Sequence, residues 1–361
     1  MLTYRDVPRN LCLLRLSAIG DVTHVLPTLR TIQHNWPDTA ITWIIGKTEA
    51  SLVGDIPGVE FVIFDKDKGI RGFFDLGKRL KGSRFDVFLN MQGSYRAAVC
   101  SKMVDSSIYL DFASFRDKDD KKGIFKNMPS QPRDGQHVLD GFLEFTKALG
   151  LNKTILRWDL PIPDRDMEFA TRQMPEGKDF LVVNPCSSIR FRNYRNWRVR
   201  SYAQVIEEAA SKYGLKAVLT GGPAQGEREF ADAITSSVSQ PVIDLVGQTT
   251  LKQLAAVLSR ARVVISPDTG CAHIANAVGT PVVGLYATSN PERTGPYLCL
   301  DTTVNRYPDA VYKAFGKSPD ELPWGKRVRS PEAMDLITVN DVLDKLGMAL
   351  DKHLDLKIQS Q

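Results

Sequence analysis

Short apolar runs alternate with amphipathic stretches along almost the whole chain. In the first half, apolar runs predict strands at residues 11–16, 41–45, 61–64, 86–90 and 108–110. Between them, apolar positions with helical spacing predict helices at 22–34, 71–81, 95–104 and 137–149. The run 41–45 is apolar at almost every position, which is typical of a strand buried on both faces. This alternation predicts a parallel α/β sheet.

The alternation of predicted strands and helices is interrupted at residues 158–166, where Pro161 and Pro163 indicate a linker, and then resumes. The second half predicts strands at 180–184, 215–220, 242–245, 262–266 and 281–286, and helices at 201–213, 225–236, 251–258 and 271–278. A length of 361 residues also favours two domains, because single cores stop growing near ~250–300 residues. We therefore expect Rossmann-like domains at 1–160 and 167–335. An irregular stretch at 307–329 precedes a last helix at 339–354, within a segment 336–361 that we expect to pack back on the first domain.

Composition narrows the class of protein. A net charge of +5 is too small for a general nucleic-acid binder. The five cysteines are widely spaced without a C-x-x-C pair, which favours reduced thiols over disulfides or a zinc site. The first ten residues lack the apolar core of a signal peptide, and no apolar run reaches the ~18 residues of a membrane span. We expect a cytoplasmic protein that binds no nucleic acid.

Ligands of open α/β sheets bind beyond the carboxyl ends of the strands, so the strand-to-helix turns are the places to search. The first such turn, 17–21, ends in Gly20 and Asp21. Asp21 has two interpretations, which are compatible. It is a favoured residue for capping a helix N-terminus. A carboxylate at that position is also suited to act as a general base.

The turn 266–273 opens a helix of the second half and contains Asp268, Thr269, Gly270 and His273. Unpaired N–H groups at a helix start bind anions, and Gly270 leaves room for a close approach. The pattern predicts a phosphate site in which His273 contacts the same anion. Asp268 either caps the helix or holds ligand hydroxyl groups.

A second anion-binding turn is predicted at 184–188, which contains Ser187 and Ser188 and leads into a run of arginines. Arg195 is our candidate for a diphosphate clamp, because guanidinium groups suit bidentate phosphate contacts; a solvated face is the alternative for the run. Beyond the glycine turn 220–222, Glu227 is the candidate for holding ribose hydroxyls, and Glu229 competes with it.

The first half carries further candidates in the turn 90–96, namely Gln92, Gly93 and Arg96, and in two basic clusters. One cluster comprises Lys66, Lys68 and Arg71, and the other includes Arg116. These residues predict an anionic acceptor, with a solvated basic face as the alternative. Two D-x-D strings, at 65–67 and 117–119, are discounted as metal sites because lysines crowd both. We expect no metal and no cofactor.

Three strings carry a resemblance to a known family: RLSAIGDVTHVLP (15–27), SPDTGCAHIANAVGTPVVGLY (266–286) and TSNPERTGPY (288–297). They resemble the lipopolysaccharide heptosyltransferases, which are GT-B glycosyltransferases. The strings NMQGSYRAA (90–98) and NW (196–197) fit the same pattern. The resemblance implies two Rossmann-like domains facing a central cleft. The first would bind the acceptor and the second ADP-heptose, and transfer to a Kdo sugar of the inner core would be inverting and metal-independent.

The resemblance also implies roles for single residues. Asp21 matches the general base, and four residues match the donor signature: Asp268, Thr269, Gly270 and His273. Ser187 and Ser188 stand where the family has small hydroxyl residues. Arg195 stands where relatives carry a lysine beside the diphosphate. Glu227 matches, loosely, a glutamate that binds ribose. The acceptor side would comprise Gly20, Gln92, Gly93, Arg96 and Arg116.

The overall pattern is closest to the enzymes that add the first heptose, and a phosphorylated Kdo would suit the basic clusters. A lipid-linked acceptor implies peripheral contact with the inner face of the inner membrane. Three alternatives stay open: a transferase for another nucleotide sugar, a related epimerase, and a protein that binds a nucleotide sugar without turnover.

Overall fold

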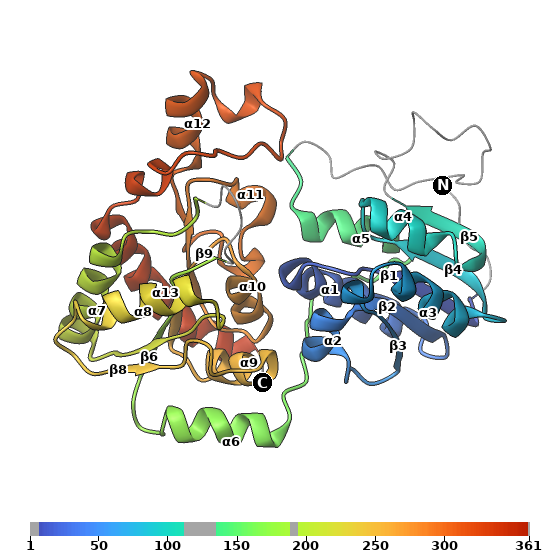
Figure 1. Ribbon diagram of the computed structural model, residues 1–361, viewed down its shortest axis with the longest axis horizontal. Helices are drawn as coiled ribbons and strands as arrows, with labels where there is room; N and C mark the ends of the chain where they lie inside the picture. The colour runs from blue at the N-terminus through green and yellow to red at the C-terminus, as the bar shows by residue number, and fades with distance from the viewer. Residues whose placement is uncertain (1–6, 112–134, 188–193, 360–361) are drawn as a thin grey trace. The chain divides into compact units, whose positions relative to one another are not determined.

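The structure is a computed structural model that describes residues 7–111, 135–187 and 194–359, with 353–359 as backbone only. The chain divides into two compact units, Met1–Pro161 and Ile162–Gln361. The division falls inside the proline-containing stretch 158–166 that the sequence indicated as a linker. Each unit contains one parallel sheet with helices on its faces (Figure 1).

The first unit is built on five parallel strands in the order β3-β2-β1-β4-β5. The strands are β1 (Asn10–Leu14), β2 (Ala40–Gly46), β3 (Val59–Phe64), β4 (Arg84–Asn90) and β5 (Asp105–Asp111). The helices are α1 (Ile19–Asn35), α2 (Lys47–Val53), α3 (Ile70–Leu80), α4 (Tyr95–Ser101) and α5 (Val138–Ala148). The predicted parallel α/β sheet is confirmed.

Both faces of this sheet are buried, as the apolar runs indicated. Cys12, Leu14 and Phe88 form one core cluster with Leu76 of α3 and Ala97 of α4. Alternate side chains of a strand point to opposite faces. Leu13, which pairs with Trp43 in register, therefore faces the other side, where α1 packs against α5.

The second unit repeats this topology with one more strand, in the order β11-β10-β9-β6-β7-β8. Its strands are β6 (Phe180–Val183), β7 (Lys216–Leu219), β8 (Val242–Asp244), β9 (Val263–Pro267), β10 (Val282–Tyr286) and β11 (Val304–Asn305). Its helices are α6 (Asp164–Gln173), α7 (Val199–Tyr213), α8 (Gln225–Thr235), α9 (Leu251–Ser259), α10 (Gly270–Ala277), α11 (Pro291–Thr294), α12 (Tyr307–Phe315) and α13 (Val339–Gln359).

The strand order reverses once in each sheet. In the first unit β1 lies between β2 and β4, and in the second unit β6 lies between β7 and β9. At such a point the connections leave toward opposite sides and open a crevice beyond the carboxyl ends of the strands. The turns after β1, β4, β6 and β9 therefore surround the two candidate binding positions.

The last helix contributes to the core of the second unit. Val342, Leu346, Ala349 and Leu350 of α13 belong to the core of the second unit, together with Leu285 of β10. Their spacing of four, seven and eight residues forms one apolar stripe on a helix, and the second sheet covers it. The expected packing of the segment 336–361 on the first domain stays a prediction.

Four α-helices of the described residues were not predicted: α2, α6, α11 and α12. The helix α12 lies in the stretch 307–329 that we expected to be irregular, because prolines dominated its pattern. Pro308 occupies the first turn of α12, where no backbone donor is needed. None of the helices in the described part of the chain has the length and apolarity that crossing a membrane requires.

Candidate active site

An ion pair holds Asp21 at the turn after β1. Asp21 is the third residue of α1, and its Oδ2 lies 2.5 Å from Nη2 of Arg15. The same oxygen accepts a hydrogen bond from the backbone N–H of Ala18, 3.2 Å away. Arg15 in turn donates from Nη1 to the carbonyl of Met91, at 2.5 Å, and its guanidinium lies 5.1 Å from the centre of the Phe142 ring.

The arrangement leaves the other carboxylate oxygen of Asp21 available. Oδ1 receives no hydrogen bond or ion pair from any residue in the described ranges, and a third of the side chain is exposed (33%). The residue at the N-cap position itself is Ala18, so Asp21 caps the helix only by reaching back from its third position. Asp21 thus contributes to capping α1 through Oδ2, and its role as a general base stays a prediction.

Gln92 joins the two turns at the crevice of the first unit. Its Oε1 accepts from the backbone N–H groups of Leu16 (2.7 Å) and Ser17 (3.3 Å), and its Nε2 donates to Ser94 Oγ (3.2 Å). The amide is thus engaged within the protein and fixes the turn after β1 against the turn after β4. Its predicted contact with an acceptor stays a prediction.

The other acceptor candidates differ in exposure. Gly20 is buried in the first turn of α1, whereas Gly93, in the turn before α4, and Arg96, in the first turn of α4, are exposed. Arg116 lies outside the described residues. Of the two D-x-D strings, 65–67 lies within the described residues and 117–119 does not. Asp65 of the first string forms an ion pair with Lys47 at 3.2 Å.

In the second unit, the start of α10 presents uncapped backbone donors. Thr269 is the N-cap residue, but its side chain does not bond to the helix. Its hydroxyl instead joins Ser266 Oγ (2.9 Å) and Oδ1 of Asn184 (3.3 Å). The first N–H groups of α10 therefore point at no side chain of the described residues, which is the arrangement an anion requires.

Asp268 is buried beside this helix start and carries two interactions. Its Oδ2 accepts a hydrogen bond from Ser289 Oγ at 2.8 Å. Arg195 donates to the backbone carbonyl of Asp268 at 2.7 Å and lies 3.6 Å from Oδ2. The structure thus brings Arg195, from a position 73 residues earlier, to the turn that the sequence identified as a phosphate site.

His273 and Ser187 lie in the same region of the second unit. His273 is the fourth residue of α10 and is 7% exposed. Ser187 is buried in the turn after β6, where its N–H and hydroxyl both donate to Oδ1 of Asn196, at 2.9 and 3.1 Å. Asn196, the first residue of the NW string, therefore helps to fix the turn after β6. Ser188 lies outside the described residues.

The structure distinguishes the two candidate ribose ligands. Glu227 is 8% exposed, and its Oε2 accepts from the backbone N–H of Gly222 at 2.7 Å. Side chains at Gly221 or Gly222 would meet this carboxylate at 3.0 Å, so the glycines allow its approach. Glu229 is exposed and bonds to Gln225 of its own helix. Glu227 therefore lies at the strand-end turn, and Glu229 does not.

Comparisons with known proteins identify the family. A sequence profile described as glycosyltransferase family 9 (heptosyltransferase) matches residues 73–321. The lipopolysaccharide core heptosyltransferase OpsX of Haemophilus influenzae is 37% identical over 348 residues, covering 96% of this chain and 99% of that protein. This chain belongs to glycosyltransferase family 9.

Solved structures agree with the fold of this family. A glycosyl transferase family 9 protein from Veillonella parvula superposes with a TM-score of 0.77 at 20% identity, covering 97% of this chain and 98% of that one. Heptosyltransferase WaaC of E. coli, solved with ADP, gives a TM-score of 0.69 at 18% identity over 94% and 99%. The family 9 chain thus has the GT-B architecture and is a glycosyltransferase of the heptosyltransferase type.

Three residues of this family 9 site were not predicted from the sequence. Arg15 orients Asp21, Asn184 bonds to both Thr269 and the carbonyl of Thr220, and Ser289 bonds to Asp268. A charged residue at the end of an otherwise apolar strand was the available signal for Arg15. Asn184 offered a similar signal, since it ends the strand 180–184. Nothing in the pattern distinguished Ser289.

The arginine run of this glycosyltransferase separates into different roles. Arg195 lies at the α10 turn, whereas Arg198 pairs with Asp335 through bonds of 2.5 and 2.6 Å. The remaining arginines before them, at 190 and 192, lie outside the described residues. The solvated-face interpretation thus fits Arg198, and the clamp interpretation is compatible with Arg195.

Cysteine and metal chemistry receive no support from the described residues of the family 9 chain. All five cysteines are free and buried. Burial raises the pKa of the Cys100, Cys186 and Cys271 thiols to about 12. Within the described ranges, no group of three or more His, Cys, Asp or Glu side chains is placed to hold a metal ion.

Proposed function

We propose that this glycosyltransferase moves heptose from ADP-heptose to a Kdo residue of the lipopolysaccharide inner core, with inversion and without a metal. The observation that carries the proposal is the carboxylate of Asp21, which Arg15 holds by Oδ2 while Oδ1 stays open. Two relatives support the substrates. The Haemophilus protein is named as a lipopolysaccharide core heptosyltransferase, and E. coli WaaC was solved with ADP.

The donor would bind at the α10 turn of the second unit. The uncapped N–H groups that follow Thr269 are suited to the diphosphate, and Arg195 and His273 lie at the same helix start. Glu227 at the glycine turn after β7 is suited to hold the ribose hydroxyls. Ser187 adds a buried hydroxyl in the neighbouring turn.

In the transfer step, the acceptor hydroxyl oxygen forms a bond to the anomeric carbon of the heptose. Its proton passes to Oδ1 of Asp21, and the bond from the anomeric carbon to the diphosphate oxygen breaks. ADP leaves with the bonding electron pair. Fixed positive groups stabilise that developing charge without reorganising, which is the usual source of such catalysis. General-base assistance is typically worth ~10²–10⁴-fold in rate.

The decisive experiment incubates the purified chain with ADP-heptose and a Kdo-containing acceptor. Release of ADP that requires acceptor, with a mass increase of one heptose in the product, is the expected result. Asp21→Asn should lose ~10²–10⁴-fold in kcat and keep its affinity for ADP. Asp38→Asn is the matched control, because Asp38 is an exposed carboxylate of the same unit.

The same experiment separates the alternatives. Tight binding of ADP-heptose without turnover would indicate a protein that only holds the nucleotide sugar. Turnover with another nucleotide sugar, or epimerisation of the donor without acceptor, would replace the proposed reaction. Full activity of Asp21→Asn would remove the base assignment.

We also propose that the protein is cytoplasmic and meets the anionic inner face of the inner membrane through α3. Ile70 and Phe74 are 75% and 67% exposed, and they lie one helical turn apart on the same face. The exposed cations Arg71, Lys78 and Lys81 flank them. An apolar stripe between cations is the arrangement of a helix that lies in a bilayer interface. Because α3 follows β3, its first turn lies at the same sheet edge as Asp21.

A further inference from the structure

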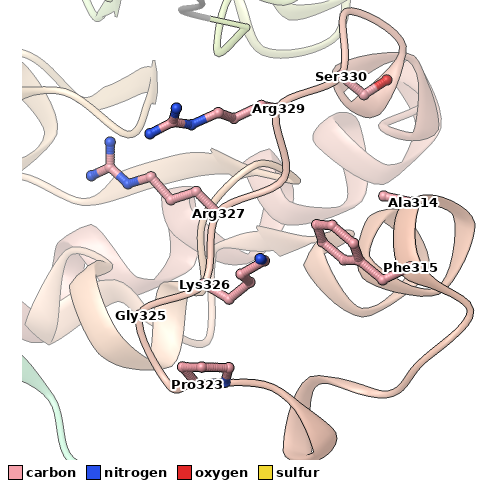
Figure 2. A pocket seen from close by; sticks show the side chains of 8 residues that line it. All are labelled: Ala314, Phe315, Pro323, Gly325, Lys326, Arg327, Arg329 and Ser330. Carbon is pink, nitrogen blue, oxygen red and sulfur yellow. The ribbon is translucent and has the colours of Figure 1, made fainter.

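A basic pocket lies in the second unit, between α12 and the segment 323–330. It has a volume of about 960 Å³ and is open to solvent. Ala314 and Phe315 of α12 form one wall, and the segment that runs from Pro323 to Ser330 forms the other (Figure 2). Three of its lining residues are cations, namely Lys326, Arg327 and Arg329. None of the candidate site residues described above lines this pocket.

The segment that carries these cations is firmly held. The backbone N–H of Val328 donates to the carbonyl of Thr288 at 2.9 Å, and Tyr307 donates from its hydroxyl to the carbonyl of Lys326 at 2.7 Å. Val328 itself is 3% exposed and belongs to the core. Because side chains alternate along an extended chain, the residues on either side of Val328 share one direction. Figure 2 shows Arg327 and Arg329 extending side by side, away from Phe315.

The two arginines have no counter-ion among the described residues. Neither guanidinium forms a hydrogen bond or an ion pair there, and both residues are exposed. The nearest acidic residues along the chain are already engaged: Glu332 pairs with Lys313 at 2.8 Å, and Asp335 pairs with Arg198. Lys326 lies 4.8 Å from the centre of the Phe315 ring. Two adjacent guanidinium groups without a carboxylate are a geometry that suits a phosphate.

The pocket adjoins the α10 turn, where we propose that the donor binds. Thr288, which holds Val328, precedes Ser289, and Ser289 bonds to Asp268. The pKa of the Tyr286 phenol depends on charges from both places. Burial raises this pKa well above its usual value, and Asp268 raises it further. Arg195 and Arg327 lower it. Arg327, Arg195 and Asp268 therefore all influence the phenol of Tyr286.

We propose that Arg327 and Arg329 bind a phosphate group of a substrate, in a subsite beside the α10 turn. The identity of that substrate rests on the proposed function. The phosphate belongs either to the diphosphate of the donor or to a phosphomonoester on the acceptor sugar. Both sources present the same oxygens to the two guanidinium groups, and direct binding measurements distinguish them.

The test measures binding by calorimetry for the whole chain and for the double variant Arg327→Ala/Arg329→Ala. The probes are ADP, Kdo and Kdo phosphate. A tenfold or larger rise in the Kd of ADP would assign the subsite to the donor. An unchanged Kd for ADP, with a tenfold or larger rise for Kdo phosphate but not for Kdo, would assign it to the acceptor. Lys317→Ala is the matched control, since it removes an exposed cation from the loop after α12.

Changes within twofold for ADP and Kdo phosphate, equal to those of the control, would overturn the proposal. The pair Arg327→Lys/Arg329→Lys should recover only part of the lost affinity, because an ammonium keeps the charge without the bidentate fork. None of these measurements needs turnover. A failure of heptose transfer in the wild-type chain would therefore contradict the proposed function and leave the subsite test readable.

Discussion

Arg15 and Asp21 flank the first strand-to-helix turn and meet in an ion pair of 2.5 Å between Nη2 and Oδ2. The guanidinium side chain is 12% exposed, whereas the carboxylate side chain is 33% exposed. The pair is therefore anchored on the protein side and open on the solvent side. This asymmetry fixes the direction of Oδ1, which is the oxygen that our mechanism requires.

Replacing Arg15 should reduce kcat more than it changes donor binding. Without the guanidinium, Asp21 loses one of its two Oδ2 contacts, and a misplaced base can cost ~10²-fold in rate. We expect about that loss for Arg15→Met, with partial recovery in Arg15→Lys. Steady-state kinetics with both substrates would show it. A parallel loss of ADP affinity would indicate general damage to the fold instead of a misoriented base.

Arg195 should contribute to donor affinity, and Arg198 should not. Charge-assisted hydrogen bonds are worth ~1.5–3 kcal/mol, so Arg195→Ala should weaken ADP binding about 10- to 100-fold. Arg198→Ala is the control from the same run, because its side chain is engaged with Asp335. Calorimetry with ADP measures both. Equal effects of the two changes would contradict the separation of roles that the structure indicates.

The exposed face of α3 should govern attachment to membranes. Ile70→Ser/Phe74→Ser should weaken binding to vesicles that contain anionic phospholipid, and added salt should weaken it further, since the flanking cations are exposed. Tyr312→Ser is the control, because Tyr312 is 71% exposed in the second unit. Sedimentation with vesicles gives the bound fraction. Attachment that survives the double change would place the contact elsewhere.

The cysteines should be nearly inert in the native protein. The thiolate is the reactive form, and a pKa of about 12 for Cys100, Cys186 and Cys271 leaves about 10⁻⁴ of each thiol ionised at pH 8. The reaction with iodoacetamide should therefore be slow and rise with pH. After unfolding in denaturant, all five cysteines should be modified rapidly. Rapid labelling of the native chain, followed by mass spectrometry, would contradict the buried environment.

The sequence predicted the main strands and helices because their patterns are local. Apolar runs such as 41–45 and helical spacing such as 201–213 depend only on neighbouring residues, and both correspond to elements of the structure, β2 and α7. The helix α2 was missed because it has only seven residues and follows β2 directly, and α6 was missed because it begins directly after Pro163, within the stretch that indicated a linker. The packing of α13 in the core of the second unit could not be predicted, because an amphipathic pattern says that a face is buried, not which sheet covers it.

The candidate turns were also visible in the sequence, since a strand, a turn with glycine and a polar residue, and a helix follow one another directly. By itself the chain determined that Asp21 and the residues 268–273 stand at strand ends, and it carried the motifs of its family. Only the tertiary structure decided which partners reach them: Arg15 for Asp21, Arg195 for Asp268, and Glu227 in preference to Glu229. The physical reason is distance along the chain, because a contact across 73 residues depends on how strands are ordered in a sheet, and no local pattern records that order.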